Sequence, residues 1–325
     1  MGEQNLSNER ASLLADVAEM YYLEEKDQTE IARKVGVTRS MISRMLKEAR
    51  EKGIVEIRVH RSLQTEFSLE SALIRQFQLE GALVISPPKT AGPHYLEYLG
   101  SAGAVALKRY LKPGITLGTS WGTSVSAVVD SLQVEGPIAV KIVQLVGALG
   151  ARNTEYDGHA LVARLEEKLN GEAHYLNAPF LCPNPKTAST LLKTKGIQET
   201  IELGRKSDMA LLGIGSTNPK FSSYYLAGYV PLAELKKLHQ DGAVGDVCGL
   251  HFDIKGKSIC SDFCKRLVTI SKDDLTGIPL RIGVAGGLGK VVPILGALRA
   301  GYINYLVTDS DTARAALDRS EKTED

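Results

Sequence analysis

Along the first fifty residues, hydrophobic and polar positions alternate with a helical period. Apolar residues recur at the spacing of one helix face before the acidic stretch 24–27, at Leu13, Leu14, Val17, Ala18, Tyr21 and Tyr22. Two shorter helices are predicted after that stretch, Gln28–Val35 and Arg39 to about Lys52. Gly36 and Gly53 end them, because glycine adopts the positive φ of a helix terminus, and Thr38 is a favourable N-cap for the second.

The spacing of small and branched residues within this helix pair is typical of a helix-turn-helix. Ala32 lies four residues before Gly36, which lets the two helices approach closely where they cross. A small core is predicted between the helices, from Ile31, Val35, Val37, Ile42 and Met45. A helical hairpin that never contacts DNA would need the same core. It would not need the second helix to expose so many basic and hydroxyl side chains.

The next amphipathic segment, from Leu63 to about Gln78, predicts a connecting helix. Its apolar positions, Leu63, Phe67, Ile74 and Phe77, fit either the core of a larger domain or a contact with a second copy of the chain. A helix-turn-helix protein usually needs a dimer to read two half-sites. Both interpretations of this helix therefore stay open.

After Pro87-Pro88, short apolar runs alternate with helical segments. Strands are predicted at 115–117, 140–146, 209–214, 282–285 and 303–308, and helices at 101–110, 159–169, 197–204 and 291–300. This alternation predicts an α/β fold with a parallel sheet covered on both faces. Such folds bind ligands outside the carboxyl ends of their strands, where loops lead into helices.

Composition and charge fit a soluble protein with a local basic surface. The 325 residues are 43% hydrophobic and 24% charged, no run approaches about 18 apolar residues, and the first residues are polar, so we expect a cytoplasmic protein without a membrane partner. The net charge is only +1, but residues 1–30 hold two Lys/Arg against eight Asp/Glu, whereas residues 31–61 hold nine against three. Such a basic segment favours duplex DNA, which exchanges condensed counterions for fixed cations.

Candidate DNA contacts can be sorted by position. Residues at the start of the third helix are expected to reach base edges in the major groove: Thr38, Arg39, Ser40, Ser43 and Arg44. Gln28, Lys47 and Arg50 are expected to hold the phosphate backbone. The alternating run 54–60 predicts a small wing, where His60 and Arg61 are further candidates for phosphate contact.

Three glycine-containing loops follow predicted strands. The loop 118–124 combines glycines with hydroxyls at a helix start, an arrangement that suits phosphate oxygens. In the loop 286–290, Lys290 opposes the dipole of the helix it opens, which is unfavourable unless an anion binds. The third loop, 213–216, is compatible with a packed turn. The glycine order in 283–289 is not that of a dinucleotide fingerprint.

Four cysteines in 325 residues do not indicate a disulfide framework. Cys260 and Cys264, with His251 nearby, could form half of a zinc site, but no second cluster has ligand spacing. We therefore predict neither a metal nor a cofactor.

The helix-turn-helix resembles the start of the SorC family of sugar-responsive bacterial regulators. The resemblance rests on Tyr21-Tyr22, on 28–32, on 37–39 with 42–44, and on 49–55. It extends through 118–122, 243–249 with 252–253, 285–287 with Lys290, and 306–309 with 312–313. It implies a larger domain that is similar in fold to the ribose-phosphate isomerase and glucosamine-phosphate deaminase enzymes, with a phosphorylated sugar as effector.

By matching position, the resemblance implies an effector site made from several loops. Asp253 would accept sugar hydroxyls, Lys290 would neutralise the phosphate, and Gly286 and Gly287 would also belong to the effector site. The phosphate itself would be cradled by Gly118, Thr119, Ser120, Gly122 and Thr123. One departure concerns the second strand, where Val146 precedes Gly147 and several family members carry a basic residue. Gln144 and Arg152 are alternative contacts from that region.

The sequence thus predicts a DNA-binding regulator with a helix-turn-helix domain at 1–61 and an effector and oligomerisation domain at 62–325. Its expected partners are a double-stranded DNA operator, a small phosphorylated sugar and further copies of itself, in a homodimer or homotetramer. A sugar-phosphate isomerase is the alternative, but Asp253, Asp262 and His251 form no compact acid–base motif. A DNA-binding protein that senses nothing is a third possibility, which the loops at Thr123 and Lys290 argue against. Whether the effector releases DNA or strengthens its binding stays open.

Overall fold

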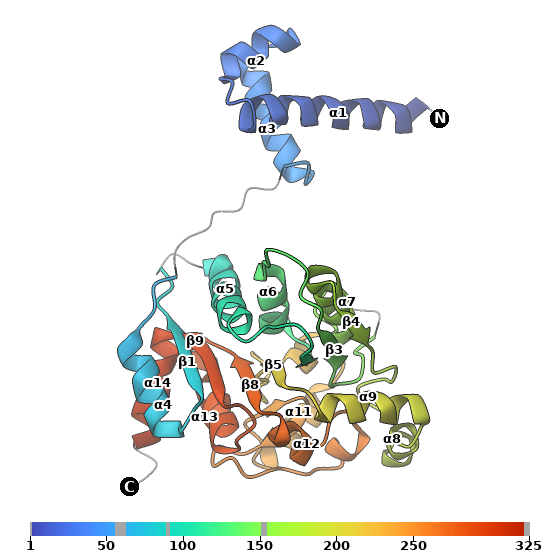
Figure 1. The fold of residues 1–325 in the computed structure, drawn as a ribbon, viewed down its shortest axis with the longest axis vertical. Helices are drawn as coiled ribbons and strands as arrows, with labels where there is room; N and C mark the ends of the chain where they lie inside the picture. The colour runs from blue at the N-terminus through green and yellow to red at the C-terminus, as the bar shows by residue number, and fades with distance from the viewer. Residues whose placement is uncertain (1, 56–62, 89–91, 151–154, 322–325) are drawn as a thin grey trace. The chain divides into compact units, whose positions relative to one another are not determined.

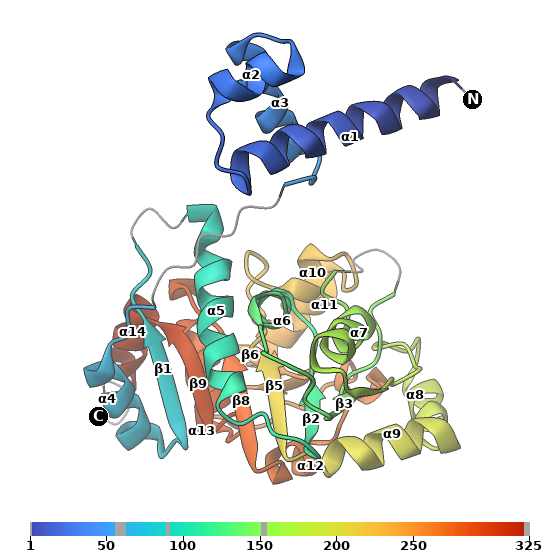
Figure 2. The same cartoon turned by 45° about the horizontal axis from the view of Figure 1, so that its top comes forward.

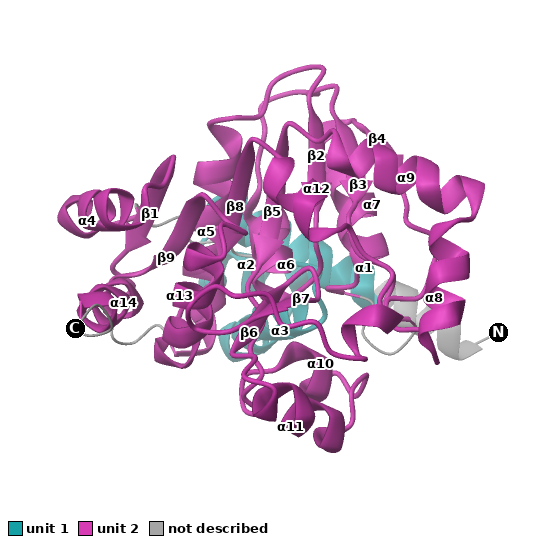
Figure 3. Cartoon of the chain, turned by 90° about the horizontal axis from the view of Figure 1, so that it is seen from below, with its two compact units in different colours: residues 1–62 teal, residues 63–325 magenta. Residues whose placement is uncertain are grey.

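The computed structural model describes residues 2–55, 63–88, 92–150 and 155–321 (Figure 1). The chain divides into two compact units, residues 1–62 and 63–325 (Figure 3). Most of the predicted wing strand, with His60 and Arg61, lies outside the described residues, as does Arg152.

The first unit is a three-helix domain, α1 (Gly2–Tyr22), α2 (Gln28–Val35) and α3 (Arg39–Glu51). The Asp27 carboxylate caps α2 by accepting from the N–H groups of Thr29 and Glu30, and the Glu30 side chain bonds back to the Asp27 N–H. Gly36 ends α2 with a φ of 77°, and Thr38 caps α3 by accepting from the N–H of Met41. The sequence predicted the turn glycine and the Thr38 cap; Asp27 is an additional capping residue.

Side chains of all three helices share one core: Leu14, Val17, Ala18, Met20, Ile31, Ala32, Ile42, Met45, Leu46 and Ala49. Three of the five predicted core residues are fully buried there, and Val35 and Val37 are partly buried against it. The buried Ala32 keeps the two helices close, as its small side chain predicted.

The second unit is built on seven parallel strands in the order β1-β9-β8-β5-β2-β3-β4 (Figure 2). Their bounds are β1 (Gly81–Ile85), β2 (Thr116–Thr119), β3 (Lys141–Gln144), β4 (Glu172–His174), β5 (Met209–Gly213), β8 (Leu280–Val284) and β9 (Tyr305–Asp309). Strand residues alternate between two cores, as in β5, where Leu211 packs on one face of the sheet and Leu212 on the other. The sheet is therefore buried on both sides, which confirms the predicted α/β class.

Helices cover both faces of this sheet. One core joins the sheet to α5 (Tyr95–Lys108), α6 (Thr123–Ser131) and α7 (Gly158–Leu169). The opposite core receives α4 (Phe67–Phe77), α11 (Leu232–Gln240), α12 (Lys272–Gly277), α13 (Val291–Arg299) and α14 (Ser310–Glu321). The remaining elements are α8 (Pro185–Leu192), α9 (Lys195–Arg205), α10 (Ser223–Leu226), the antiparallel hairpin β6 (Gly245–Val247) and β7 (Leu250–Phe252), and the 3₁₀ turns Gly92–His94, Cys264–Arg266 and Leu288–Lys290.

The connecting helix starts later than predicted. It begins at Phe67, because the preceding residues are extended against the end of β1, where Thr65 forms an antiparallel bridge to Ile85. The helix then packs its buried Leu73 into the core of the second unit, while Phe67 is exposed. Of the two roles predicted for this helix, a single chain therefore shows the packing into the core of the larger domain.

Within the part of the chain that the structure describes, no helix combines the length and the apolar character needed to cross a membrane.

Candidate functional site

The first candidate site is the exposed face of α3. Its buried side carries Ile42, Met45, Leu46 and Ala49. The predicted DNA contacts all lie on the exposed side or at the cap: Thr38, Arg39, Ser40, Ser43, Arg44, Lys47 and Arg50. Gln28 is half-buried at the start of α2. The exposed side of α3 and its cap therefore hold all the residues expected to contact bases or phosphates except Gln28.

Ion pairs neutralise the acids of α3. Arg10 and Lys52 contact the Glu48 carboxylate at 2.7 and 2.9 Å, and their hydrogen bonds lower the pKa of Glu48 to about 2. Glu51 lies 3.6 Å from the ammonium of Lys47. Because Arg39, Arg44 and Arg50 form no ion pair with any other described residue, this face keeps an excess of positive charge.

The second candidate site is a cavity of about 400 Å³ at the carboxyl ends of β2, β5 and β8. Three loops meet in it: 120–124 after β2, 213–215 after β5, and Lys290 from the loop after β8. The sequence was compatible with a packed turn at 213–216. In the structure, Gly213, Ile214 and Gly215 line the cavity, whereas Ser216 is buried and does not line it. Further wall residues come from Tyr156, the segment 220–226, and the hairpin residues Asp246, Cys248 and Gly249.

The start of α6 faces this cavity without a cap. Gly122 precedes the helix with a φ of 131°, and no side chain of a described residue caps it. No described residue accepts a hydrogen bond from the N–H groups of Thr123 and Ser124, and both residues line the cavity. Uncapped amides at a helix N-terminus attract anions. Ser120 adds a hydroxyl, although that group also accepts from the N–H of Gly213 at 3.1 Å.

Lys290 brings a positive charge to the same cavity. Its ammonium donates to the carbonyl oxygen of Ile214 at 2.8 Å and more weakly to that of Phe221 at 3.4 Å. Burial lowers the pKa of Lys290 to about 8, and the nearby charge of Asp246 opposes this lowering. The carbonyls are neutral, so the ammonium has no anionic partner in direct contact among the residues that the structure describes.

Two buried polar groups of the cavity wall are incompletely hydrogen-bonded within the described residues. Asp246 accepts from the N–H of Gly249 through Oδ2, whereas its Oδ1 and the Tyr224 hydroxyl form no hydrogen bond of good geometry with a described residue. The two groups are close enough to interact, because burial and the Asp246 carboxylate together raise the pKa of Tyr224. Asp246 is 5% exposed and Tyr224 3%, so leaving these atoms unpaired is costly. A ligand hydroxyl could satisfy both.

Aromatic rings form one side of the cavity. Trp121, the single tryptophan of the sequence, lies 5.4 Å from the ring of Tyr224 and 5.9 Å from that of Phe180, centroid to centroid. Tyr224 and Phe180 stack with an interplanar angle of 19°. This wall offers an apolar surface beside the polar groups.

Five residues predicted for the effector site do not line this cavity: Gly118, Thr119, Asp253, Gly286 and Gly287. Gly118 and Thr119 are buried within β2, where a Cβ at Gly118 would collide with Leu145 and the Thr119 hydroxyl donates to the Ser120 carbonyl. Asp253 follows β7 and uses its carboxylate in a turn, accepting from the N–H groups of Lys255 and Lys257. The hairpin carboxylate that faces the cavity is Asp246.

Gly286 and Gly287 instead wrap around a buried carboxylate. Asp309 accepts from the hydroxyl of Tyr95 at 2.5 Å, from the N–H of Gly287 at 2.8 Å, and from the N–H and hydroxyl of Thr312 at 2.9 and 2.6 Å. A Cβ at Gly286 would collide with Tyr95 and Asp309. These four bonds lower the pKa of Asp309 against the effect of burial, which alone would raise it. Together they fix the loop that carries Lys290.

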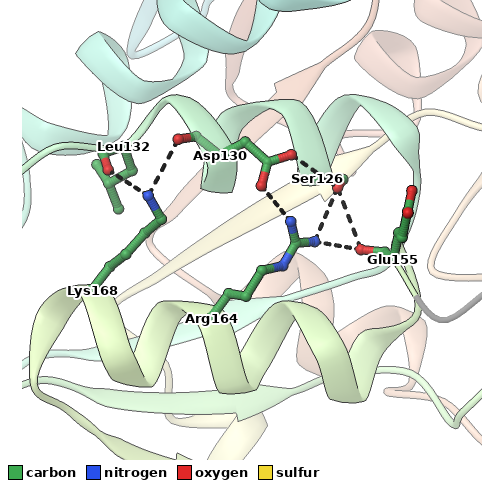
Figure 4. A network of polar contacts seen from close by, with 6 residues as sticks. All are labelled: Ser126, Asp130, Leu132, Glu155, Arg164 and Lys168. Carbon is green, nitrogen blue, oxygen red and sulfur yellow. Dashed lines mark hydrogen bonds and ion pairs between the residues drawn. The ribbon is translucent and has the colours of Figure 1, made fainter. Parts of the chain in front are cut away.

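Figure 4 shows a second polar network, which ties α6 to α7 beside the cavity. Arg164 donates to Asp130 and to the Ser126 hydroxyl on α6, and to the carbonyl oxygen of Glu155. The next residue, Tyr156, lines the cavity and accepts from the N–H of Gly122 at 3.1 Å. Arg164 therefore helps to hold both the uncapped helix start and the tyrosine next to it.

Gln144, a candidate effector contact, and Cys264, a candidate zinc ligand, have partners inside the protein. Gln144 donates to the carbonyl oxygen of Val146 and accepts from the N–H of Leu176, so both ends of its amide are used. The Cys264 sulfur lies 3.6 Å from Nδ1 of the buried His251, and Cys260 is exposed. The described residues contain no group of three or more His, Cys, Asp or Glu that could hold a metal ion.

Comparison with known proteins places this architecture among regulators. Residues 61–318 match the family model described as "Putative sugar-binding domain". The chain is 31% identical to the sorbitol operon regulator of Klebsiella pneumoniae over 94% of this chain and 97% of that protein. It is 30% identical to the deoxyribonucleoside regulator of Bacillus subtilis over 95% and 98% of the two chains. The crystal structure of the full-length Klebsiella regulator, SorC, aligns with a TM-score of 0.71 and 30% identity over 94% of this chain and 99% of that one.

Proposed function

Because this chain belongs to the SorC family of sugar-responsive transcriptional regulators, we propose that a phosphorylated sugar is its effector and binds in the cavity at the carboxyl edge of the sheet. The relatives are named as regulators and not as enzymes, so the protein is a transcriptional regulator and the isomerase alternative is set aside. That one relative regulates a sorbitol operon and another is a deoxyribonucleoside regulator supports a carbohydrate-derived ligand.

One observation carries the proposal: the cavity wall combines groups that suit an anion with groups that suit hydroxyls. The ammonium of Lys290 and the uncapped start of α6 make the first set. Asp246 Oδ1 and the Tyr224 hydroxyl, neither of which forms a hydrogen bond of good geometry with a described residue, make the second. A sugar phosphate carries both complementary groups, whereas a free sugar lacks the anion and inorganic phosphate lacks the hydroxyl chain.

The role that we propose for each residue follows from the group that it presents to the cavity. Ser120, Gly122, Thr123 and Lys290 bind the phosphate, and Asp246 with Tyr224 binds sugar hydroxyls in place of Asp253. The predicted glycines and threonine that do not line the cavity support the loops that do. Gly118 and Thr119 belong to the strand that leads to the loop, and Gly286 with Gly287 holds the Lys290 loop against Asp309.

The test is a thermal-shift screen of the full chain against hexitol phosphates, pentose phosphates and the corresponding free sugars. A ligand that binds only the folded protein raises the melting temperature by mass action. We expect a shift with one phosphorylated compound, and its loss in Lys290→Ala. A shift with free sugars that Lys290→Ala retains would reject the phosphate.

For the DNA side, we propose that α3 reads the operator of a carbohydrate-related operon from a homodimer or homotetramer, with residues 1–61 as the DNA-binding domain and residues 62–325 as the sensor. Thr38, Arg39, Ser40, Ser43 and Arg44 contact bases, and Gln28, Lys47 and Arg50 contact phosphates. Support comes from the exposure of all these residues except the half-buried Gln28, and from the neutralised acids of α3. Arg44→Ala should relax sequence preference in a binding-site selection from random duplexes; an unchanged preference would remove Arg44 from base reading.

A further inference from the structure

The first turn of α3 presents one apolar side chain among its polar residues. Met41 is 43% exposed, whereas Ile42, Met45 and Leu46 on the same helix are 0%, 2% and 3% exposed. The core of the first unit therefore does not require Met41. Its neighbours on this turn, Arg39 and Ser40, are exposed as well.

The position of Met41 is fixed by the helix cap. Its N–H donates to the Thr38 hydroxyl at 3.3 Å, and Arg44 follows one turn later. Residues three apart on a helix lie on the same side, so Met41 stands between two residues proposed to contact bases. An exposed thioether at this place removes apolar surface from water only when something apolar covers it.

Duplex DNA offers one apolar group on its major-groove edges, the 5-methyl group of thymine. Methionine is unbranched and polarizable, so its side chain adapts to such a group without a fixed geometry. The surrounding positive charge brings DNA to this face but does not select a base.

We propose that Met41 is a specificity-determining residue that contacts the 5-methyl group of a thymine in the operator. This inference rests on the proposed reading of DNA by α3. It adds a contact to the hydrogen-bonding residues proposed above, and its chemistry is apolar.

The test removes the methyl group and nothing else. Duplexes are selected from a random library with the full chain, and each thymine of the selected site is replaced in turn by deoxyuridine. We expect one position in each half-site at which the replacement weakens wild-type binding about fourfold, the factor that corresponds to one buried methyl group. In Met41→Ala, the same replacement should leave the affinity unchanged.

Leu23→Ala is the matched control, because Leu23 is 76% exposed and apolar but lies outside α3. This variant should keep the wild-type sensitivity to deoxyuridine. The slope of affinity against salt should be the same in all three proteins, since no phosphate contact is changed.

Two results would overturn the proposal. In the first, no thymine shows a sensitivity that Met41→Ala loses, while Arg44→Ala still relaxes sequence preference; α3 then reads DNA without Met41. In the second, Met41→Ala weakens binding to every duplex equally and changes the salt slope, which identifies a backbone contact. If neither Arg44→Ala nor Met41→Ala alters sequence choice, the reading of bases by α3 fails together with this contact.

Discussion

At the level of single residues, two aspartates of the β6–β7 hairpin have different environments. Asp246 lines the cavity beside Tyr224, and its Oδ1 forms no hydrogen bond of good geometry with a described residue, whereas Asp253 is satisfied by the backbone of its own turn. Asp246→Asn should weaken the sugar ligand about tenfold to a hundredfold, because a hydrogen bond to a charged acceptor contributes about 1.5–3 kcal/mol. Asp253→Asn keeps an oxygen acceptor for the turn and should leave the affinity unchanged. Titration of the Trp121 fluorescence with the ligand measures both.

The comparison of these two variants is decisive for the hydroxyl-binding groups of the site. If Asp253→Asn weakens the ligand and Asp246→Asn does not, the sugar is held at the far end of the hairpin and the cavity has been assigned the wrong ligand. Equal, small effects would remove both carboxylates from recognition.

The pKa of Lys290 predicts how the affinity for a phosphorylated ligand depends on pH. Its pKa in the unliganded protein is about 8, and a bound phosphate dianion would raise that pKa by stabilising the ammonium. Ligand binding then takes up a proton when the pH exceeds 8. The affinity should fall only about twofold between pH 7 and 8 and by up to about tenfold per pH unit above 8. Isothermal titration from pH 7 to 9.5 checks this dependence.

Lys290→Arg is the control for this pH dependence, because a guanidinium stays protonated throughout that range. The variant should bind with an affinity that no longer falls above pH 8. An affinity of the wild type that is flat up to pH 9.5 would show that the ammonium does not contact the ligand.

At the level of elements, the sequence was most informative where local chemistry decides the structure. Gln28–Val35 was predicted with its observed bounds, since Gly36 adopts the left-handed conformation that ends α2. The start of α3 after Thr38 was also correct. In the sheet, the continuous apolar runs gave β2, β3, β5, β8 and β9 to within a few residues.

Elements defined by distant partners were not predicted. β1 was missed because its Gly81–Ile85 run precedes the proline pair and is stabilised by pairing with β9, far along the chain. The extended residues before α4 had a helical pattern, and the bridge between Thr65 and Ile85 overrides it. The cavity was located by the rule for strand ends, but Asp246 was overlooked, since nothing in its sequence environment distinguishes it from Asp253.

The hydrogen bonds that hold the Lys290 loop predict an effect of Tyr95→Phe on both stability and ligand affinity. Tyr95→Phe removes one of the four hydrogen bonds to Asp309, which join α5, the Gly287 loop and α14 to this carboxylate. We expect a loss of about 1 kcal/mol in the free energy of unfolding. A displaced Lys290 should also weaken the phosphorylated ligand more than its unphosphorylated form. Denaturant unfolding and paired ligand titrations measure the two effects.

Tyr98→Phe is the matched control on α5, because no described residue bonds the Tyr98 hydroxyl. It should change neither quantity. If Tyr95→Phe lowers stability while the ratio of the two affinities stays at its wild-type value, the Asp309 cluster supports the fold without positioning Lys290.

At the level of the whole molecule, a regulator must couple its sugar site to its DNA site, and this coupling is reciprocal. If the effector changes operator affinity by some factor, the operator must change effector affinity by the same factor, because both describe one thermodynamic cycle. The factor is expected to lie between about 5 and 150, whichever direction the regulation takes. A ligand that binds both states equally would give no regulation, however tightly it binds.

The single tryptophan makes this cycle measurable in the full chain. Trp121 lines the cavity, so its fluorescence reports effector binding with and without saturating operator duplex. The operator affinity is measured separately by the anisotropy of labelled DNA, with and without saturating effector. The two ratios should agree, and Lys290→Ala should remove the coupling while leaving the DNA affinity of the unliganded chain unchanged. A change in operator affinity without a matching change in the Trp121 titration would mean that the regulatory ligand binds outside this cavity.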